Sequence, residues 1–169
     1  MGRWNPDSAA ARTLGRAVAE WLPNLHDVFL NASVVRKCMY AAPVEGAPEM
    51  FGITNRARLE RLWVALLAVL VEAWSSPSMK PVREHISRIV DTTELTRVLR
   101  DARRSGRLER MIECRNYMCH RDKREYWDAG RDAPVGELVF HETLHMAFSR
   151  VLLAAMRHAN AVTEPQSPE

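Results

Sequence analysis

LWVALLAVLVEAW, residues 62–74, is the segment that decides the fold, because it is apolar throughout except for Glu72. It is shorter than the roughly 20 apolar residues that a membrane-spanning helix needs. Thr54 or Asn55 can cap a helix ahead of it, and a stretch rich in serine and proline begins at Ser75. The segment therefore predicts a long helix, ending at about Ser75, that is buried in the core of a globular protein.

Outside this segment the sequence predicts further helices and no strand. Proline, glycine and capping residues mark the breaks between them. Pro23 is expected to end the first helix, because a proline inside a helix removes a backbone hydrogen bond. The other expected helices run from Asp7 or Ser8 to Trp21, Pro23 to Tyr40, Pro81 to Val90, Asp91 to Arg104, Leu108 to Asp128 and Glu137 to Ala161. Long amphipathic helices joined by short loops are typical of an all-α helical bundle.

Composition and length fit one globular domain. The chain has 169 residues, of which 47% are hydrophobic and 27% charged, with a net charge of +3. We expect a single all-helical domain over residues 1–169, with a disordered tail from about residue 162. Lys37, Lys80 and Lys123 are the only lysines, so nearly all cations are arginines. Arginine suits phosphate binding through its planar fork of donors, although codon bias in a GC-rich genome would enrich arginine as well.

Cysteine usage and the first residues bear on the compartment. Cys38, Cys114 and Cys119 cannot all pair with one another, and none forms a C-x-x-C motif. This pattern predicts reduced thiols in a cytoplasmic protein. The first residues, MGRWNPDSAA, lack the apolar core of a signal peptide. No association with a membrane is expected.

RNYMCHRDKREYW, residues 115–127, is the first candidate site. Arg115 is followed at once by Asn116 and then, after three more residues, by His120. None of the other histidines has an arginine five to seven positions before it. Histidine can act as acid or base near neutral pH, and a guanidinium can hold a phosphate. The charges that follow would also form a solvated, salt-bridged helix face, so both interpretations stay open.

RNYMCH resembles the motif of the HEPN family, in which four to six residues separate an arginine from a histidine, often with a polar residue directly after the arginine. The resemblance implies a HEPN-like helical bundle, here with extra N-terminal helices, and a metal-independent endoribonuclease without a cofactor. Arg115, Asn116 and His120 would be its catalytic residues. It also implies RNA as substrate, a homodimer, a role as a toxin or phage-defence effector, and an antitoxin or other inhibitor protein as partner. Asp122 stands where some members have a modifiable tyrosine, which puts that regulation in doubt.

The chemistry assigns a role to each residue of the motif. Without a metal, the ribose 2′-hydroxyl is the nucleophile, and it needs a base and an acid. His120 is expected to be one of these, Arg115 to hold the phosphate, and Asn116 to orient the histidine or the phosphate. Five residues along a helix turn Arg115 and His120 about 140° apart. Two copies whose motifs face each other would bring an acid, a base and a guanidinium to one phosphate, as the family resemblance implies.

An arginine-rich surface is a candidate path for RNA, because phosphates are attracted to it. Four of its arginines, Arg97, Arg100, Arg104 and Arg107, fall on one stripe only if the helix continues through Gly106. Glu94, Asp101 and Glu109 would neutralise much of this charge. The expected RNA-binding residues are Arg97, Arg100, Arg104 and Arg107, together with Arg121, Lys123 and Arg124.

HETLH, residues 141–145, is the second candidate, because it matches the zinc-protease pattern H-E-x-x-H. In that pattern His141 and His145 bind Zn²⁺ and Glu142 activates a water. A catalytic zinc also needs a third protein ligand. His158 lies too far along the same predicted helix to be that ligand.

Simple packing also explains the two histidines, since they flank an apolar stripe that includes Phe140 and Leu144. A structural or adventitious metal bound by the pair is a further interpretation. Three functions are therefore compatible with the sequence alone. The first is a HEPN-like endoribonuclease with no metal. The second is a non-catalytic HEPN-like module that binds nucleic acid or protein, and the third is a zinc metalloprotease that uses His141, Glu142 and His145.

Overall fold

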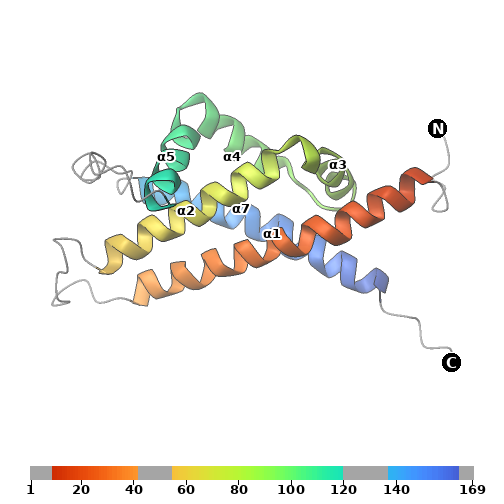
Figure 1. The fold of residues 1–169 in the computed structure, drawn as a ribbon, viewed down its shortest axis with the longest axis horizontal. Coiled ribbons are helices and arrows are strands. Elements are labelled where there is room, and N and C mark those ends of the chain that lie inside the picture. Colours follow the sequence, from red (N-terminus) through yellow and green to blue (C-terminus); the bar gives the residue numbers. More distant parts are fainter. Residues whose placement is uncertain (1–8, 42–54, 120–136, 164–169) are drawn as a thin grey trace.

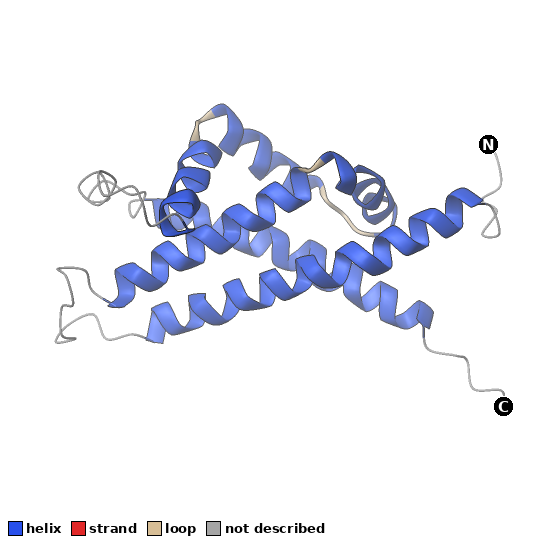
Figure 2. Ribbon diagram, viewed as in Figure 1, coloured by secondary structure: helices blue, strands red, loops and turns tan. Residues whose placement is uncertain are grey.

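The computed structural model describes residues 9–41, 55–119 and 137–163, and in these residues every element is helical (Figure 2). This confirms the all-α class. The elements are α1 (Ala9–Ala41), α2 (Asn55–Ser75), a short 3-10 turn (Pro77–Met79), α3 (Lys80–Ile89), α4 (Thr93–Arg104), α5 (Arg107–Cys119) and α7 (Leu138–Thr163).

The helices form a bundle around α2 (Figure 1). Helices α1 and α2 run antiparallel along each other, and α7 crosses behind them. Helix α5 packs on α2, while α4 joins α5 to the rest and contacts α7. Helix α3 contacts α1 and α7 at the end of the bundle where α1 begins and α7 ends.

The core forms where α2 meets the other helices. Trp63, Leu67 and Leu70 of α2 are fully buried, as are Phe148 and Leu152 of α7. Burying a side chain of this size stabilises a fold by about 1.5–3 kcal/mol. The apolar run that predicted a core helix therefore has that role, and the predicted limits of α2 are confirmed.

Pro23 does not end a helix, contrary to the sequence-based prediction. Helix α1 continues through it from Ala9 to Ala41. Leu22, Leu25 and Phe29 are buried on both sides of the proline. Their packing against the core holds the helical path, and it offsets the backbone hydrogen bond that Pro23 cannot donate.

Gly106 separates α4 from α5. Its φ of 72° is left-handed, a conformation that glycine adopts without steric cost. Ser105 closes α4 with a backbone hydrogen bond to the carbonyl of Asp101 at 3.0 Å. At the other end of α4, the carboxylate of Asp91 accepts a hydrogen bond from the Thr93 backbone N–H at 2.9 Å, which lowers the pKa of Asp91. The N-cap residue itself is Thr92, whose side chain makes no capping hydrogen bond.

Several predicted features lie outside the described residues. They are the continuation of α5 to Asp128, the loop before α7 and the tail. Among the described helices, none is long and apolar enough by itself to cross a membrane. Residues Arg56–Ser75 of α2 and Pro77–Ile89 together have the length and composition of a membrane span, but the two segments are bent by 64° relative to each other.

Candidate functional site

Helix α5 carries the start of the RNYMCH motif and is fixed to α2 by an apolar stripe. Leu108, Met111 and Cys114 recur every three residues and are buried. The Cys114 thiol donates a long hydrogen bond, 3.9 Å, to the carbonyl of Arg61 on α2. Burial raises the pKa of this thiol. The next residue, Arg115, therefore lies at the edge of the seam between α5 and α2.

Arg115 is held by two neighbours. Its Nη1 donates to the carboxylate of Glu72, the single charge in the core segment of α2. Its Nε and Nη2 donate to the amide oxygen of Asn116, at 3.2 and 2.6 Å. The side chain of Arg115 is 27% exposed. Two of its five N–H donors have no partner within the described part of the chain.

His120 lies outside the described residues, because the described part of α5 ends at Cys119. The structure therefore brings Arg115 and Asn116 together but says nothing of the third residue of the motif. Arg121, Lys123 and Arg124 also lie outside it.

The predicted arginine stripe is broken at Gly106. Arg97, Arg100 and Arg104 share one side of α4, but Arg107 belongs to α5, beyond the left-handed turn. The condition for one continuous stripe, a helix that runs on through Gly106, is therefore not met, because glycine at positive φ ends the helix there.

Acidic side chains pair with many of these arginines. Asp101 lies 3.8 Å from Arg97 and 3.9 Å from Arg100. Glu94, which was expected to neutralise this surface, pairs instead with Arg150 of α7. Arg104 is exposed on α4. The positive character of this surface is therefore weaker than the count of arginines indicates.

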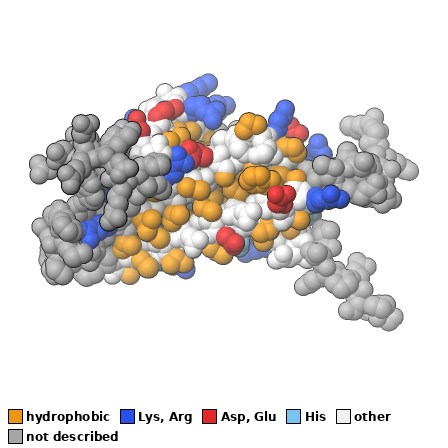
Figure 3. Space-filling model, viewed as in Figure 1, with side chains coloured by type: hydrophobic (Ala, Val, Ile, Leu, Met, Phe, Trp, Pro, Cys, Tyr) orange, Lys and Arg blue, Asp and Glu red, His pale blue; other side chains and the backbone are white. Residues whose placement is uncertain are grey.

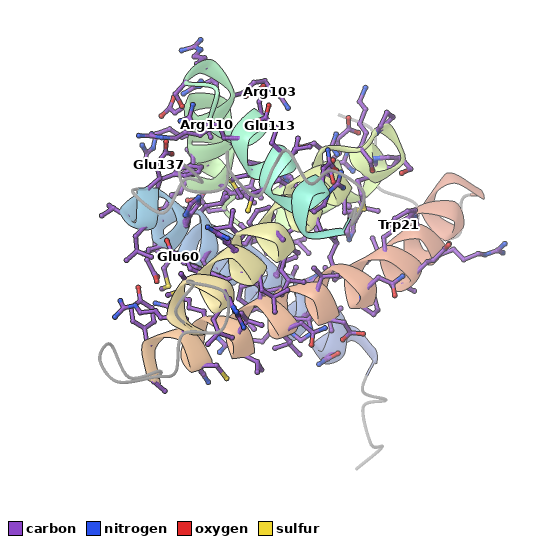
Figure 4. All side chains as sticks on the ribbon, turned by 60° about the vertical axis from the view of Figure 1, so that its left-hand side comes forward. Trp21, Glu60, Arg103, Arg110, Glu113 and Glu137 are labelled. Atoms are coloured by element: carbon purple, nitrogen blue, oxygen red, sulfur yellow. The ribbon has the colours of Figure 1, made fainter. Side chains whose placement is uncertain are left out.

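Arg107 and Arg110 meet the beginning of α7. Both pair with Glu137, at 2.8 and 2.5 Å, and Figure 4 shows Arg110 beside Glu137. Burial alone would raise the pKa of Glu137, but the two guanidinium groups hold it below its usual value. The Arg107 guanidinium also lies 5.1 Å from the centre of the Phe140 ring. A hollow of about 330 Å³ opens here, with Arg97 and Arg107 both in its wall.

The HETLH histidines are buried rather than at the boundary of the core, where the sequence placed them. His141 is 0% exposed and His145 is 4% exposed. Trp63 donates a hydrogen bond from Nε1 to Nδ1 of His145 at 3.2 Å, and Ser33 Oγ lies 3.4 Å from the other ring nitrogen. Both ring nitrogens of His141 lack a hydrogen-bond partner in the described structure. Burial lowers the pKa of each histidine to about 4.

Glu142 is engaged by α1. Arg36 Nε donates to both carboxylate oxygens at 2.8 Å, and Tyr40 donates its hydroxyl at 2.5 Å. Burial would raise the pKa of Glu142, but these hydrogen bonds hold it below its usual value. The carboxylate that a zinc protease would use to activate water is thus occupied in joining α7 to α1.

Among the described residues, the donor set around HETLH does not form a catalytic zinc site. Such a site needs three protein ligands that converge on one point. The described residues contain no group of three or more histidine, cysteine, aspartate or glutamate side chains placed to hold a metal ion. His145 already shares its ring nitrogens with Trp63 and Ser33.

Sequence reasoning missed the partners of both motifs. Glu72 was the one available signal, since a lone charge inside an apolar helix needs a partner when it is partly buried. Arg36 and Tyr40, four residues apart on α1, gave no signal, because nothing local indicates that they meet residue 142.

Comparisons with protein-family models, with curated proteins and with solved structures find no match for this chain. The resemblance of RNYMCH to the HEPN motif is therefore an observation on the sequence alone.

Proposed function

We propose that this chain is a cytoplasmic, metal-independent endoribonuclease of HEPN type, with Arg115, Asn116 and His120 as its catalytic residues. The position of Arg115 carries the proposal. Glu72 and Asn116 hold its guanidinium at a partly exposed edge of α5, five residues before the histidine of the motif. A guanidinium that is oriented before the substrate arrives stabilises a developing phosphate charge without reorganisation.

The proposed reaction needs a base, an acid and this guanidinium. The base removes the proton of the ribose 2′-hydroxyl, and the 2′-oxygen then forms a bond to the adjacent phosphorus. The bond from phosphorus to the 5′-oxygen breaks, and the acid gives that oxygen a proton. The products are a 2′,3′-cyclic phosphate and a 5′-hydroxyl. His120 is one of the two proton-transfer groups, and Arg115 holds the phosphate through its remaining N–H donors.

A homodimer supplies the second proton-transfer group in this proposal. The observation that favours it is an apolar face over α1 and α2 (Figure 3). Leu30 and Val34 of α1 and Leu62 of α2 are 44%, 59% and 39% exposed. Exposed apolar side chains that gather on one side of a molecule mark interaction sites. We call the surface formed by these three residues the α1/α2 face.

The α1/α2 face reaches the candidate site along α2. Leu62, Leu66, Val69 and Ala73 follow one another at spacings of four, three and four, the repeat of a helix-pairing seam. Glu72 lies one turn after Val69, so the Arg115–Glu72 pair borders this seam. A two-fold axis through the α1/α2 face would bring two such pairs to the same side of the dimer.

RNA cleavage in EDTA tests the proposal. Wild-type protein should cleave a single-stranded oligoribonucleotide in EDTA and leave a cyclic phosphate, and His120→Ala should abolish the cleavage. His26→Ala, which changes a histidine of α1 outside the motif, is the matched control and should cleave like the wild type. A His120→Ala protein that cleaves RNA as fast as the wild type would contradict the proposal.

The same samples separate the alternatives. A non-catalytic module would bind the oligoribonucleotide and leave it intact in all three proteins. A zinc metalloprotease would contain about one zinc per chain in elemental analysis, and the zinc would be lost in His141→Ala.

A further inference from the structure

A second cavity, apart from the motif, lies at the junction of α1, α3 and α7. Its volume is about 540 Å³, within the range of small-molecule sites. Its walls are mainly aliphatic: Leu22 and Val18 from α1, Ile86 and Ile89 from α3, and Ala155 and Met156 from α7. A cavity of this size and lining favours an apolar ligand body, because water inside it finds few hydrogen-bond partners.

The polar groups of the cavity come from two helices. His85 of α3 and His158 and Asn160 of α7 line it. His85 is partly buried, and its pKa is lowered by burial and then by the nearby charges of Arg88 and His158. The groups whose charges lower the pKa of His85 are thus cationic when charged, and no aspartate or glutamate is among the described residues that line the cavity. An anionic group of a ligand would be the electrostatic complement.

We propose that this cavity binds a monomeric amphiphile with an aliphatic body and a single carboxylate, the chemical class of a medium-chain fatty acid. The aliphatic walls take the chain, and the ring N–H groups of His85 and His158 donate hydrogen bonds to the carboxylate. The cavity shares no lining residue with the Arg115–Glu72 pair, so this proposal stands independently of the endoribonuclease activity.

Titration calorimetry with decanoate below its micellar concentration tests the site. Saturable binding at one site per chain is expected. Ala19→Trp adds an indole from an exposed lining residue of α1 and should weaken binding by about tenfold or more. Ala41→Trp, at an exposed alanine near the other end of the same helix, is the matched control and should bind like the wild type.

Decanol, which has the same chain without the charge, tests the polar end. The double variant His85→Gln, His158→Gln should weaken decanoate binding by about tenfold and leave decanol binding unchanged. His26→Gln, outside the cavity, should change neither. Unchanged decanol binding also shows that the double variant is folded.

Three outcomes would overturn the proposal. The first is the absence of saturable decanoate binding. The second is binding that Ala19→Trp leaves intact but that Leu30→Ser removes, which would place the ligand on the α1/α2 face. The third is equal weakening of decanoate and decanol by the histidine variants, which would remove the role of the carboxylate.

Discussion

At the scale of single residues, Arg115 combines two partners that fix its plane. Glu72 binds one end of the guanidinium and Asn116 binds its side. A lysine at this position would keep the charge but lose the planar fork that makes both contacts at once. Positioning, rather than charge alone, is therefore the property that the variants should test.

Arg115→Ala and Arg115→Lys are both expected to lower kcat/KM for an oligoribonucleotide by about 100-fold or more, the usual effect of removing one preorganised donor. Glu72→Gln keeps a hydrogen-bond acceptor for Arg115 and should retain more activity than either. Circular dichroism provides the control for folding. If the lysine variant cleaves as well as the wild type, charge alone suffices and the preorganisation of Arg115 has no role.

The buried histidines His141 and His145 make stability depend on pH. Their pKa values are about 4 in the folded chain, against about 6.5 for an ordinary histidine in the unfolded chain. Between these values the unfolded chain binds more protons than the folded one, so the free energy of unfolding rises with pH. Stability should be highest above about pH 6.5 and should fall as the pH drops toward 4.

Urea unfolding between pH 4 and 7 measures this slope. His141→Leu removes one titrating group and replaces it with an apolar side chain of similar volume in a fully buried place. We expect a shallower slope and a higher free energy of unfolding than the wild type at pH 5. A slope identical to that of the wild type would show that His141 gains no proton on unfolding.

At the scale of elements, α1 shows how packing overrides a local signal. Pro23 is exposed, while Leu22, Leu25 and Phe29 of the same helix are buried. The proline still weakens the helix, because its missing N–H leaves one carbonyl of the preceding turn without its usual partner. Helix α1 exists in spite of Pro23, through contacts with α2 and α7.

Pro23→Ala is therefore expected to raise the free energy of unfolding by about 1–3 kcal/mol in urea titrations. Pro81→Ala is the matched control. Pro81 lies in the first turn of α3, where proline costs nothing, so this change should not stabilise the protein. Equal effects of the two substitutions would contradict the explanation given for α1.

At the scale of the whole molecule, the α1/α2 face and the motif together predict a homodimer. Val34→Glu and Leu62→Glu place charges on exposed positions, so the fold should survive while the dimer dissociates. Light scattering should then report a monomer, and RNA cleavage should be lost with the dimer. Met146→Glu, at an exposed position of α7, is the matched control and should leave both unchanged.

Mixing inactive chains tests whether the site is shared between subunits. Arg115→Ala and His120→Ala proteins are each expected to be inactive, and their mixture should recover part of the cleavage, because a heterodimer keeps one Arg115 and one His120 in the shared cleft. A wild-type chain that is a strict monomer at micromolar concentration and still cleaves RNA would exclude the shared site.

The helical class and the core were predictable from the sequence because they depend on local periodicity and on long apolar runs. The segment 62–74 identified the central helix, and the expected helices from Asp91 to Arg104 and from Leu108 onward placed the break between α4 and α5 where the left-handed Gly106 lies. Each is a local property, since a cap or a left-handed turn is decided by a few adjacent residues. The RNYMCH and HETLH motifs were also visible as patterns, without the contacts that distinguish a site from packing.

Only the tertiary structure decided what those patterns contact. Glu142 meets Arg36 and Tyr40 across more than 100 positions of sequence, Trp63 meets His145, and Glu72 meets Arg115. Such pairs form because α1, α5 and α7 bury their apolar sides against α2, which then sets which polar side chains face each other at the edges. Local propensity contains no information about these long-range neighbours. For the same reason it predicted a break at Pro23, where packing against other helices keeps α1 continuous.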